Sequence, residues 1–176
     1  MSDTLITVVA IFLAAILMFV FPLMTMSDRT DDVAQLSVET ETTQFVDDVR
    51  TTGKITLDKY SKFIENLGAT GNSYDVELEA KILDENPGKK ATQAQTTKIG
   101  ENVYYSVYTS QIEQKLNDKN VNNVYPLKEG DIISASVKNT NVTLSQQLKN
   151  FFYTVSGNDT YTIAAEHAGV VTATGK

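Results

Sequence analysis

The sequence predicts an α+β protein: an N-terminal transmembrane helix extended by an amphipathic helix, then a small antiparallel-sheet head with short helices. Three observations carry this prediction. Residues 5–21 read LITVVAIFLAAILMFVF and contain no charged side chain. Residues 27–52 place apolar side chains loosely at helical spacing, and residues 74–82 alternate apolar with charged side chains. We divide the chain into a membrane anchor (1–26), a helical stalk (27–53) and an extracytoplasmic head (54–176).

The composition of the 176 residues excludes several kinds of site. The chain has no cysteine and one histidine, which excludes a disulfide framework, a cysteine-based zinc site and a histidine-rich metal centre. Its 22 acidic and 15 basic side chains give a net charge of −7, whereas nucleic-acid binding requires a basic surface. We therefore predict no cofactor, no metal ion and no nucleic-acid partner.

The apolar N-terminal segment has the length of a membrane span. Extended to Met26 it has 22 residues, which at about 1.5 Å per residue gives roughly 33 Å, close to the thickness of a bilayer core. A buried core helix would need a polar stripe, and residues 5–21 offer only Thr7. A cleaved secretory signal would need a basic residue before the apolar run and a small-residue cleavage site after it. Neither is present, so we expect an uncleaved single-pass anchor.

The orientation of this span is predicted from its flanks. No Lys or Arg precedes it and only Arg29 follows closely, so the positive-inside rule has little to act on. The three residues before Thr4 are easily left in the cytoplasm. We expect the N-terminus in the cytoplasm and the rest of the chain exported.

The stalk is acidic and carries a thin apolar stripe. Residues 27–50 contain seven acids and two bases, and five apolar side chains lie loosely at helical spacing. These five are Val33, Leu36, Phe45, Val46 and Val49. Such a helix is poorly stable alone and needs a partner, either the downstream head or neighbouring copies. A solvated acidic stalk remains the alternative.

The head is punctuated by helix caps and one clear strand. Thr56 is expected to cap a helix that ends at Gly68, and the alternation from Tyr74 to Ile82 is typical of an amphipathic strand. Further strands are expected at residues 103–108, 132–138, 160–165 and 169–172. Two candidate capping boxes predict two more helices: Ser110 with Glu113, and Thr143 with Gln146 before Leu144, Leu148, Phe151 and Phe152.

Few residues in the chain suggest catalysis. His167 is expected to be structural, because the adjacent Glu166 would lie on the opposite face of a strand. Glu77 and Glu79 share a strand face about 7 Å apart, a spacing that a glycosidase could use but that an outer strand face explains equally. The acids at 28, 31 and 32 lack the spaced ligands of a calcium loop. We predict that the protein is not an enzyme, and the sequence identifies no small-molecule substrate.

The N-terminal third resembles type IV pilin-like proteins, especially the TadE-type pseudopilins of tight-adherence systems. The resemblance rests on residues 5–21, on Pro22 and on the helix that continues to about Arg50. In that family the N-terminal helix anchors the subunit, packs in the filament core after assembly and leaves an α+β head outside. Members carry a basic leader ending in Gly and usually a Glu at mature position 5; here that position is Leu5, and Asp3 is the nearby acid.

The resemblance implies a membrane-anchored surface structural subunit that assembles through its hydrophobic helix, and a surface filament is one assembly that it implies. Its partners would be the lipid bilayer and other copies or related pilin-like subunits. The residues expected to mediate helix packing are Ala10, Ala14, Ala15 and Pro22. Lys54, Lys59 and Lys62 could complement the acidic stalk of a neighbour. The alternative function is a monomeric, membrane-tethered extracellular module that binds a ligand or a protein.

Overall fold

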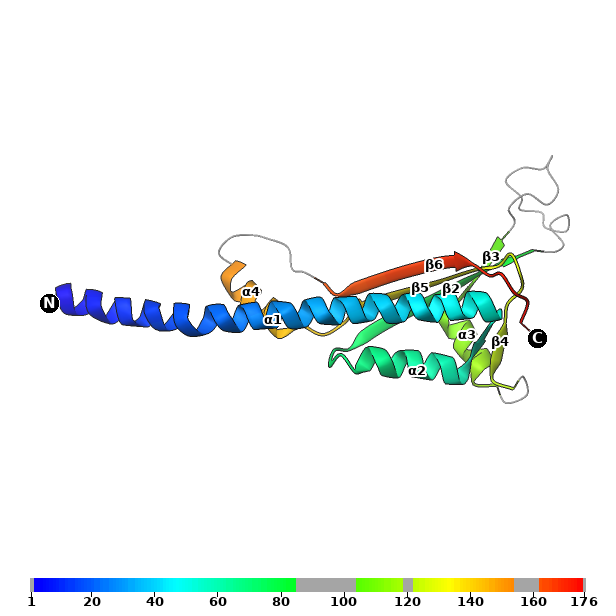
Figure 1. Cartoon of the computed structure of the whole chain (residues 1–176), viewed down its shortest axis with the longest axis horizontal. Helices are drawn as coiled ribbons and strands as arrows, with labels where there is room; N and C mark the ends of the chain where they lie inside the picture. The colour runs from blue at the N-terminus through cyan, green and yellow to red at the C-terminus, as the bar shows by residue number, and fades with distance from the viewer. Residues whose placement is uncertain (1, 85–103, 119–121, 154–161, 176) are drawn as a thin grey trace, which may run out of the picture.

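The computed structural model describes residues 2–84, 104–118, 122–153 and 162–175. It has the predicted α+β fold, with a long N-terminal helix and a small antiparallel-sheet head (Figure 1). The helices are α1 (Ser2–Thr52), α2 (Leu57–Gly68), α3 (Thr109–Leu116) and α4 (Leu144–Tyr153). The strands are β1 (Lys54–Thr56), β2 (Tyr74–Leu83), β3 (Tyr104–Tyr108), β4 (Val124–Pro126), β5 (Ile132–Asn139) and β6 (Ala164–Val170).

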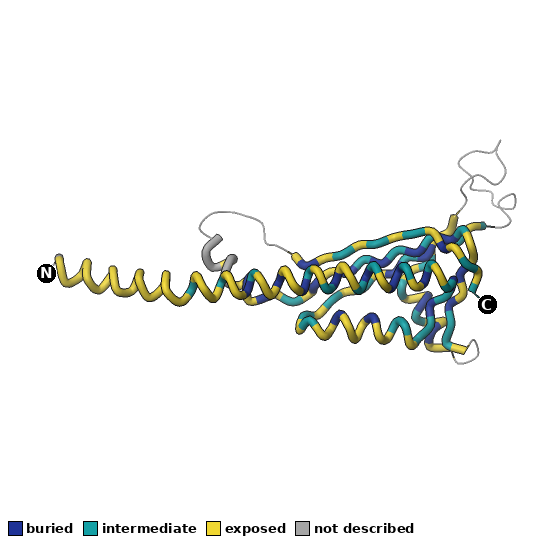
Figure 2. The backbone as a smooth tube through the Cα atoms, in the orientation of Figure 1, coloured by how far each residue is buried: buried dark blue, intermediate teal, exposed yellow. Residues whose placement is uncertain are grey.

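Helix α1 dominates the shape of the molecule. Its 51 residues span about 77 Å at the standard helical rise. The N-terminal half extends away from the head, and the C-terminal half lies along the sheet (Figure 1). Figure 2 shows the first half exposed on all sides and buried positions appearing only where the helix reaches the head. The helix continues through Pro22, whose ring nitrogen has no hydrogen to donate to the Met18 carbonyl.

The main sheet has the strand order β3-β2-β5-β6, with every pair antiparallel. Glu77 faces Ser136 across β2 and β5, and Ser136 faces Glu166 across β5 and β6. These three side chains share the outer face of the sheet because they lie in one cross-strand row. A second, two-stranded sheet joins β1 to β4 beside the end of α1.

The core lies between α1 and the inner face of the main sheet. Val38, Val46 and Val49 of α1 are fully buried, together with Ile133 and Ala135 of β5. Phe45 is also buried and stacks on Phe63 of α2, with ring centroids 4.4 Å apart. The partner that the acidic helix needs is therefore the head of its own chain, and the segment is not a solvated stalk.

The predicted stripe on this segment is only half right. Phe45, Val46 and Val49 lie in the core as expected, whereas Val33 and Leu36 are 69% and 65% exposed. The apolar part of the buried face instead begins at Ala34 and Val38, and the buried Thr42 lies within it. Thr42 tolerates burial because its hydroxyl donates to the Val38 carbonyl at 2.6 Å. The spacing of the large apolar side chains does not predict this face, because the small Ala34 and the hydroxyl-bearing Thr42 fill part of it.

A close backbone contact fixes the end of α1. Gly53 has a φ of +65°, and its amide donates to the Val49 carbonyl at 2.8 Å. A Cβ at Gly53 would overlap the backbone of Ala173 and Gly175. The C-terminal segment thus packs directly on the turn between α1 and β1, and Thr172 donates its amide hydrogen to the Arg50 carbonyl.

Several local predictions are confirmed. Thr56 caps α2 by accepting from the Lys59 amide at 3.3 Å, and β2 covers the predicted alternating segment. Thr143 and Gln146 form the expected capping box, with reciprocal distances of 3.0 and 3.2 Å.

Two local predictions are wrong. The N-cap of α3 is Tyr108 rather than Ser110, so the helix begins two residues earlier than expected, and Gln111 rather than Glu113 accepts from the backbone at its start. The last strand runs unbroken from Ala164 to Val170, because β5 pairs with it along its whole length. Residues 160–161 and Val103 of the predicted strands lie outside the described residues.

Candidate functional site

The exposed half of α1 is the first candidate site. By length and composition, this helix is long and apolar enough to cross a membrane. Within its apolar segment only Val20 and Met24 are even half-buried. The two hydroxyl groups in this segment bond to the helix itself. Thr7 donates to the Asp3 carbonyl at 2.7 Å, and Thr25 donates to the Phe21 carbonyl at 3.0 Å. The segment therefore satisfies its own side-chain hydrogen bonds, as a bilayer interior requires.

All four residues predicted to mediate helix packing, Ala10, Ala14, Ala15 and Pro22, are exposed on this segment. Helical geometry separates them into two groups. Ala10 and Ala14 lie one turn apart on the same face, whereas Ala15 is rotated by about 100° from Ala14 and shares its face with Pro22. The closest backbone approach of a second helix is therefore expected over Ala10 and Ala14.

Two carboxylates just after the apolar segment hold α4 against α1. Asp31 is buried and accepts a 2.7 Å hydrogen bond from the Thr143 hydroxyl. Asp28 accepts a short hydrogen bond from the hydroxyl of Ser145. Both hydroxyls belong to the first turn of α4 or its cap. The acids expected to face neighbouring subunits are thus engaged within the chain at this level.

Further along α1, other acids also have partners in the same chain. Asp48 contacts the Lys59 ammonium at 2.6 Å, and Glu41 accepts from the Asn66 amide at 2.8 Å. Lys62, another predicted complement for a neighbour, pairs with Asp58 at 2.9 Å. Only Lys54 of the three predicted lysines has no such ion pair among the described residues.

The outer edge of β6 is pinned to α1 at both ends. Gln35 bonds both the amide and the carbonyl of Ala164, at 3.0 and 2.7 Å. Arg50 donates from Nε to the Val170 carbonyl at 2.9 Å and from a terminal nitrogen to Asp47 at 2.8 Å. A Cβ at Gly169 would overlap the Arg50 guanidinium, so the glycine leaves room for this contact.

His167 lies on the inner face of β6, between the hydrogen bonds that Gln35 and Arg50 make to the two ends of the strand. Its Nε2 atom is 3.6 Å from the Asp47 carboxylate. Glu166 points to the outer face, as strand alternation predicts. No described serine or threonine hydroxyl bonds to the imidazole. The arrangement ties β6 to α1 and does not form a nucleophile–base pair.

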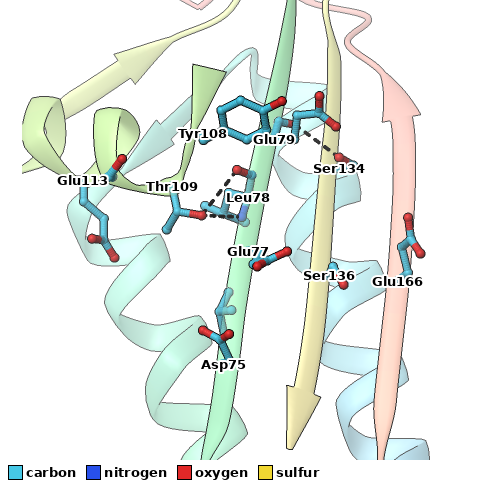
Figure 3. Close-up of a pocket in the computed structure, with 12 residues that line it drawn as sticks. Asp75, Glu77, Leu78, Glu79, Tyr108, Thr109, Glu113, Ser134, Ser136 and Glu166 are labelled. Carbon is cyan, nitrogen blue, oxygen red and sulfur yellow. Dashed lines mark hydrogen bonds between the residues drawn. The ribbon is translucent and has the colours of Figure 1, made fainter. Parts of the chain in front are cut away.

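The second candidate site is a groove of about 750 Å³ on the outer face of the sheet (Figure 3). Five carboxylates line it, and no Lys or Arg is among its described lining residues. They belong to Asp75, Glu77, Glu79, Glu113 and Glu166. The groove also presents the Tyr108 ring and the hydroxyls of β5 at 134 and 136. It is therefore a negatively charged surface with one aromatic side chain at its rim.

This groove runs along an open part of β2. Strand β3 pairs only with Glu79–Leu83, so no described strand covers Tyr74–Leu78 on that side. The Leu78 amide there donates to the Thr109 hydroxyl at 2.7 Å, as Figure 3 shows. Because backbone groups alternate in direction, the amide and carbonyl of Val76 also point to the open side.

Two tyrosines, the buried Tyr125 and the half-buried Tyr60, have raised pKa values. Burial, helped by the neighbouring Tyr105 and Asp131, raises the pKa of Tyr125 to about 12. Burial and a 2.7 Å hydrogen bond to Glu113 raise the pKa of Tyr60 well above its usual value. Both groups stay neutral at physiological pH, so these shifts concern stability rather than proton transfer.

The predicted acidic pairs do not form a catalytic or metal centre among the described residues. Glu79 accepts from the Ser106 hydroxyl at 2.7 Å and lies 3.8 Å from the Lys81 ammonium. Glu77, two residues away, lies on the floor of the groove. No group of three or more described His, Asp or Glu side chains is placed to hold a metal ion.

Comparison with known proteins gives no assignment. No protein-family model, curated protein or solved structure matches this chain. The geometry of the chain itself is therefore the basis of its functional assignment.

Sequence reasoning missed the residues that attach α4 and β6 to α1, as well as part of the groove. Ser145 and Gln35 gave no signal, because their partners lie more than a hundred residues away along the chain. The groove was visible only as the acidic face of β2. Its aromatic and hydroxyl components come from β3 and β5, whose register the sequence does not specify.

Proposed function

We propose that the protein is a membrane-anchored surface structural subunit, pilin-like or pseudopilin-like, which assembles through its N-terminal helix. The observation that carries the proposal is the division of α1: one half is exposed and apolar, and the other half is built into the core of the head. A subunit of this kind transmits the position of its helix directly to its head. The N-terminus would lie in the cytoplasm and the head outside.

Assembly would exchange lipid for neighbouring helices. Apolar side chains gain little hydrophobic energy from this exchange, so close packing and small residues must drive it. Ala10 and Ala14 offer one such face. Val33 and Leu36, exposed beyond the apolar segment, would extend the contact surface past the bilayer. Their exposure is consistent with a site that a neighbouring helix covers.

The acidic charge of α1 would not prevent such packing. Most of its carboxylates between residues 28 and 48 are engaged with hydroxyl, amide or basic groups of the same chain. Complementation by a neighbour's lysines, which the sequence suggested, is therefore not required. The proposed role needs no catalytic residue.

The test combines protein chemistry with microscopy of the native material. The protein recovered from its native membrane is analysed by intact mass and N-terminal sequencing, and sheared surface material from the same cells is imaged. Thin filaments that contain this chain, with a trimmed or N-methylated terminus, are the expected result. An unmodified terminus without filaments would reject the assembly proposal.

A second candidate is a monomeric, membrane-tethered binding module, and the groove beside β2 favours it. An extended segment could add as a strand along Tyr74–Leu78 and use the open backbone groups of Val76. The five carboxylates around it would select a positively charged segment. Cross-linking in the native membrane separates the two candidates, because only the first requires contacts between copies through α1.

A further inference from the structure

We propose that α4 is an interfacial helix that rests in the headgroup layer of the bilayer crossed by α1. This inference rests on the membrane-spanning part of the proposed function and assigns a second lipid contact to the chain. It is carried by where α4 is attached, by what its exposed side chains are, and by the charge of the segment around it.

The attachment points place α4 at the end of the apolar segment. Ser145 bonds Asp28 and Thr143 bonds Asp31. At about 1.5 Å per residue, these carboxylates lie roughly 3 and 8 Å beyond Met26 along the helix axis. The headgroup layer on each side of a bilayer is about 5–8 Å thick. Figure 1 shows α4 beside α1 at the junction between the free half of the helix and the head.

The exposed side chains at the start of α4 are apolar. Val142 is 55% exposed and Leu144 is 52% exposed, although both lie beside polar, buried neighbours. In the sequence of α4, leucine recurs at position 148 and phenylalanine at 151 and 152, and the other exposed residues that the structure describes there are Gln147 and Asn150. Leucine, phenylalanine and a terminal tyrosine, with one lysine, are the composition of helices that lie in a membrane interface.

The charge of the surrounding segment supports the same partner. The chain has 22 acidic residues, but none occurs between Asp131 and Asp159, where Lys138 and Lys149 are the only charged side chains. The neighbouring part of α1, residues 27–50, carries seven acids. Acids are thus absent from the segment that carries α4, whereas on α1 at the same height Asp28 and Asp31 are bonded to hydroxyls of that segment and Asp32 is exposed.

A helix of ten residues would bind a membrane weakly if it were free in solution. Here α1 holds it at the surface, so its binding is intramolecular and needs little intrinsic affinity. The hydrogen bonds to Asp28 and Asp31 further fix its height. A fixed position of α4 at the membrane surface would account for the hydroxyl partners of these two acids, which come from a distant part of the sequence.

The test uses the absence of cysteine from the chain. Single cysteines are introduced into the full chain as Gln147→Cys or Val142→Cys, both exposed, as Met18→Cys in the apolar segment, and as Glu129→Cys in the turn before β5. Each variant is labelled with an environment-sensitive fluorophore and reconstituted in vesicles of phosphatidylcholine and phosphatidylglycerol. Quenching is measured with lipids that carry a nitroxide near the headgroup or near the end of the acyl chain.

The expected result is strong quenching of the probes at 147 and 142 by the headgroup nitroxide. The probe at 18 should be quenched by the deep nitroxide. The fluorescence of the probe at 129 should change little with either lipid. If 18 is quenched while 147 and 142 behave like 129, the interfacial assignment is wrong and the span stands. If 18 is not quenched, the span itself fails. A blue-shifted probe at 147 that no lipid quenches would instead indicate coverage by a second copy and would overturn the proposal.

Discussion

The hydroxyl of Thr143 donates a 2.7 Å hydrogen bond to the carboxylate of Asp31, and both side chains are buried although 112 residues separate them. The bond joins the part of α1 that leaves the apolar segment to the cap of α4. A threonine that already caps its own helix thus also satisfies a buried acid on another helix.

Thr143→Val should therefore destabilise the protein. The substitution keeps the shape of the side chain but leaves the buried Asp31 carboxylate without this donor, which costs about 1–3 kcal/mol. Thermal or denaturant unfolding of the full chain in detergent micelles measures the change. The control is Thr40→Val on the exposed side of α1, expected to change stability by less than about 0.5 kcal/mol. Equal effects of the two substitutions would contradict the assigned role.

Alanine substitutions at three glycines should rank in a definite order. Gly53→Ala is the most destabilising, by roughly 2–4 kcal/mol, because it combines a positive φ with overlap on backbone atoms. Gly169→Ala should cost about 1–2 kcal/mol, because the flexible Arg50 side chain can move but loses its hydrogen bonds.

Gly68→Ala provides the matched control. It has open space around it at the end of α2, so alanine should be neutral or stabilising by up to about 1 kcal/mol. Denaturant unfolding of all three variants gives the ranking. A Gly169→Ala variant as stable as Gly68→Ala would show that the contact between Arg50 and β6 contributes little.

Stability should fall at high pH as the buried Tyr125 ionises. Tyr125 has a folded-state pKa raised from 10.0 to about 12, so the neutral form is favoured in the folded state. Its contribution is fully present below pH 10 and is lost between pH 10 and about 12, because the unfolded chain releases its proton first. Ultraviolet titration of the tyrosinates should show a late step that Tyr125→Phe makes smaller, with Tyr60 accounting for the remainder. A complete titration near pH 10 would contradict the burial of this hydroxyl.

Ala14→Leu should weaken assembly and leave membrane integration intact. The added side chain keeps the span apolar but prevents the close approach of a second helix over Ala10 and Ala14. Cell fractionation and microscopy of surface material measure the two effects separately. Ile16→Leu, which keeps the volume of the side chain, serves as control. Unchanged filaments in the Ala14→Leu variant would rule out small-residue packing at this face.

The elements that the sequence predicts well are those decided locally. The Thr56 cap and the alternation of β2 depend on residues within a few positions of one another, and both are confirmed. The face of α1 that enters the core is decided by the distant sheet, which buries Ala34 and Val38 and leaves Val33 and Leu36 exposed. Local patterns could not reveal this choice, because it depends on the space left by β5 and β6.

The candidate sites follow the same division. The apolar segment of α1 and its alanines are visible in the sequence, since a span is defined by consecutive residues. The groove is not visible, because it requires the register that places Glu77, Ser136 and Glu166 in one row. The polar attachment of α4 likewise depends on a contact across more than a hundred residues.

From Asp28 to Thr52, α1 contains neither glycine nor proline, and β2, β5 and β6 run alongside it (Figure 1). Because the helix has no glycine or proline in this region, a rotation or a shift of its apolar segment would be transmitted to the head. In the proposed membrane-anchored arrangement, the strands would stand upright on the bilayer, and the outer face of the sheet would look sideways along the membrane. A partner of the groove would then approach within the plane of the membrane. A rotation of α1 about its axis would change the direction in which the groove faces.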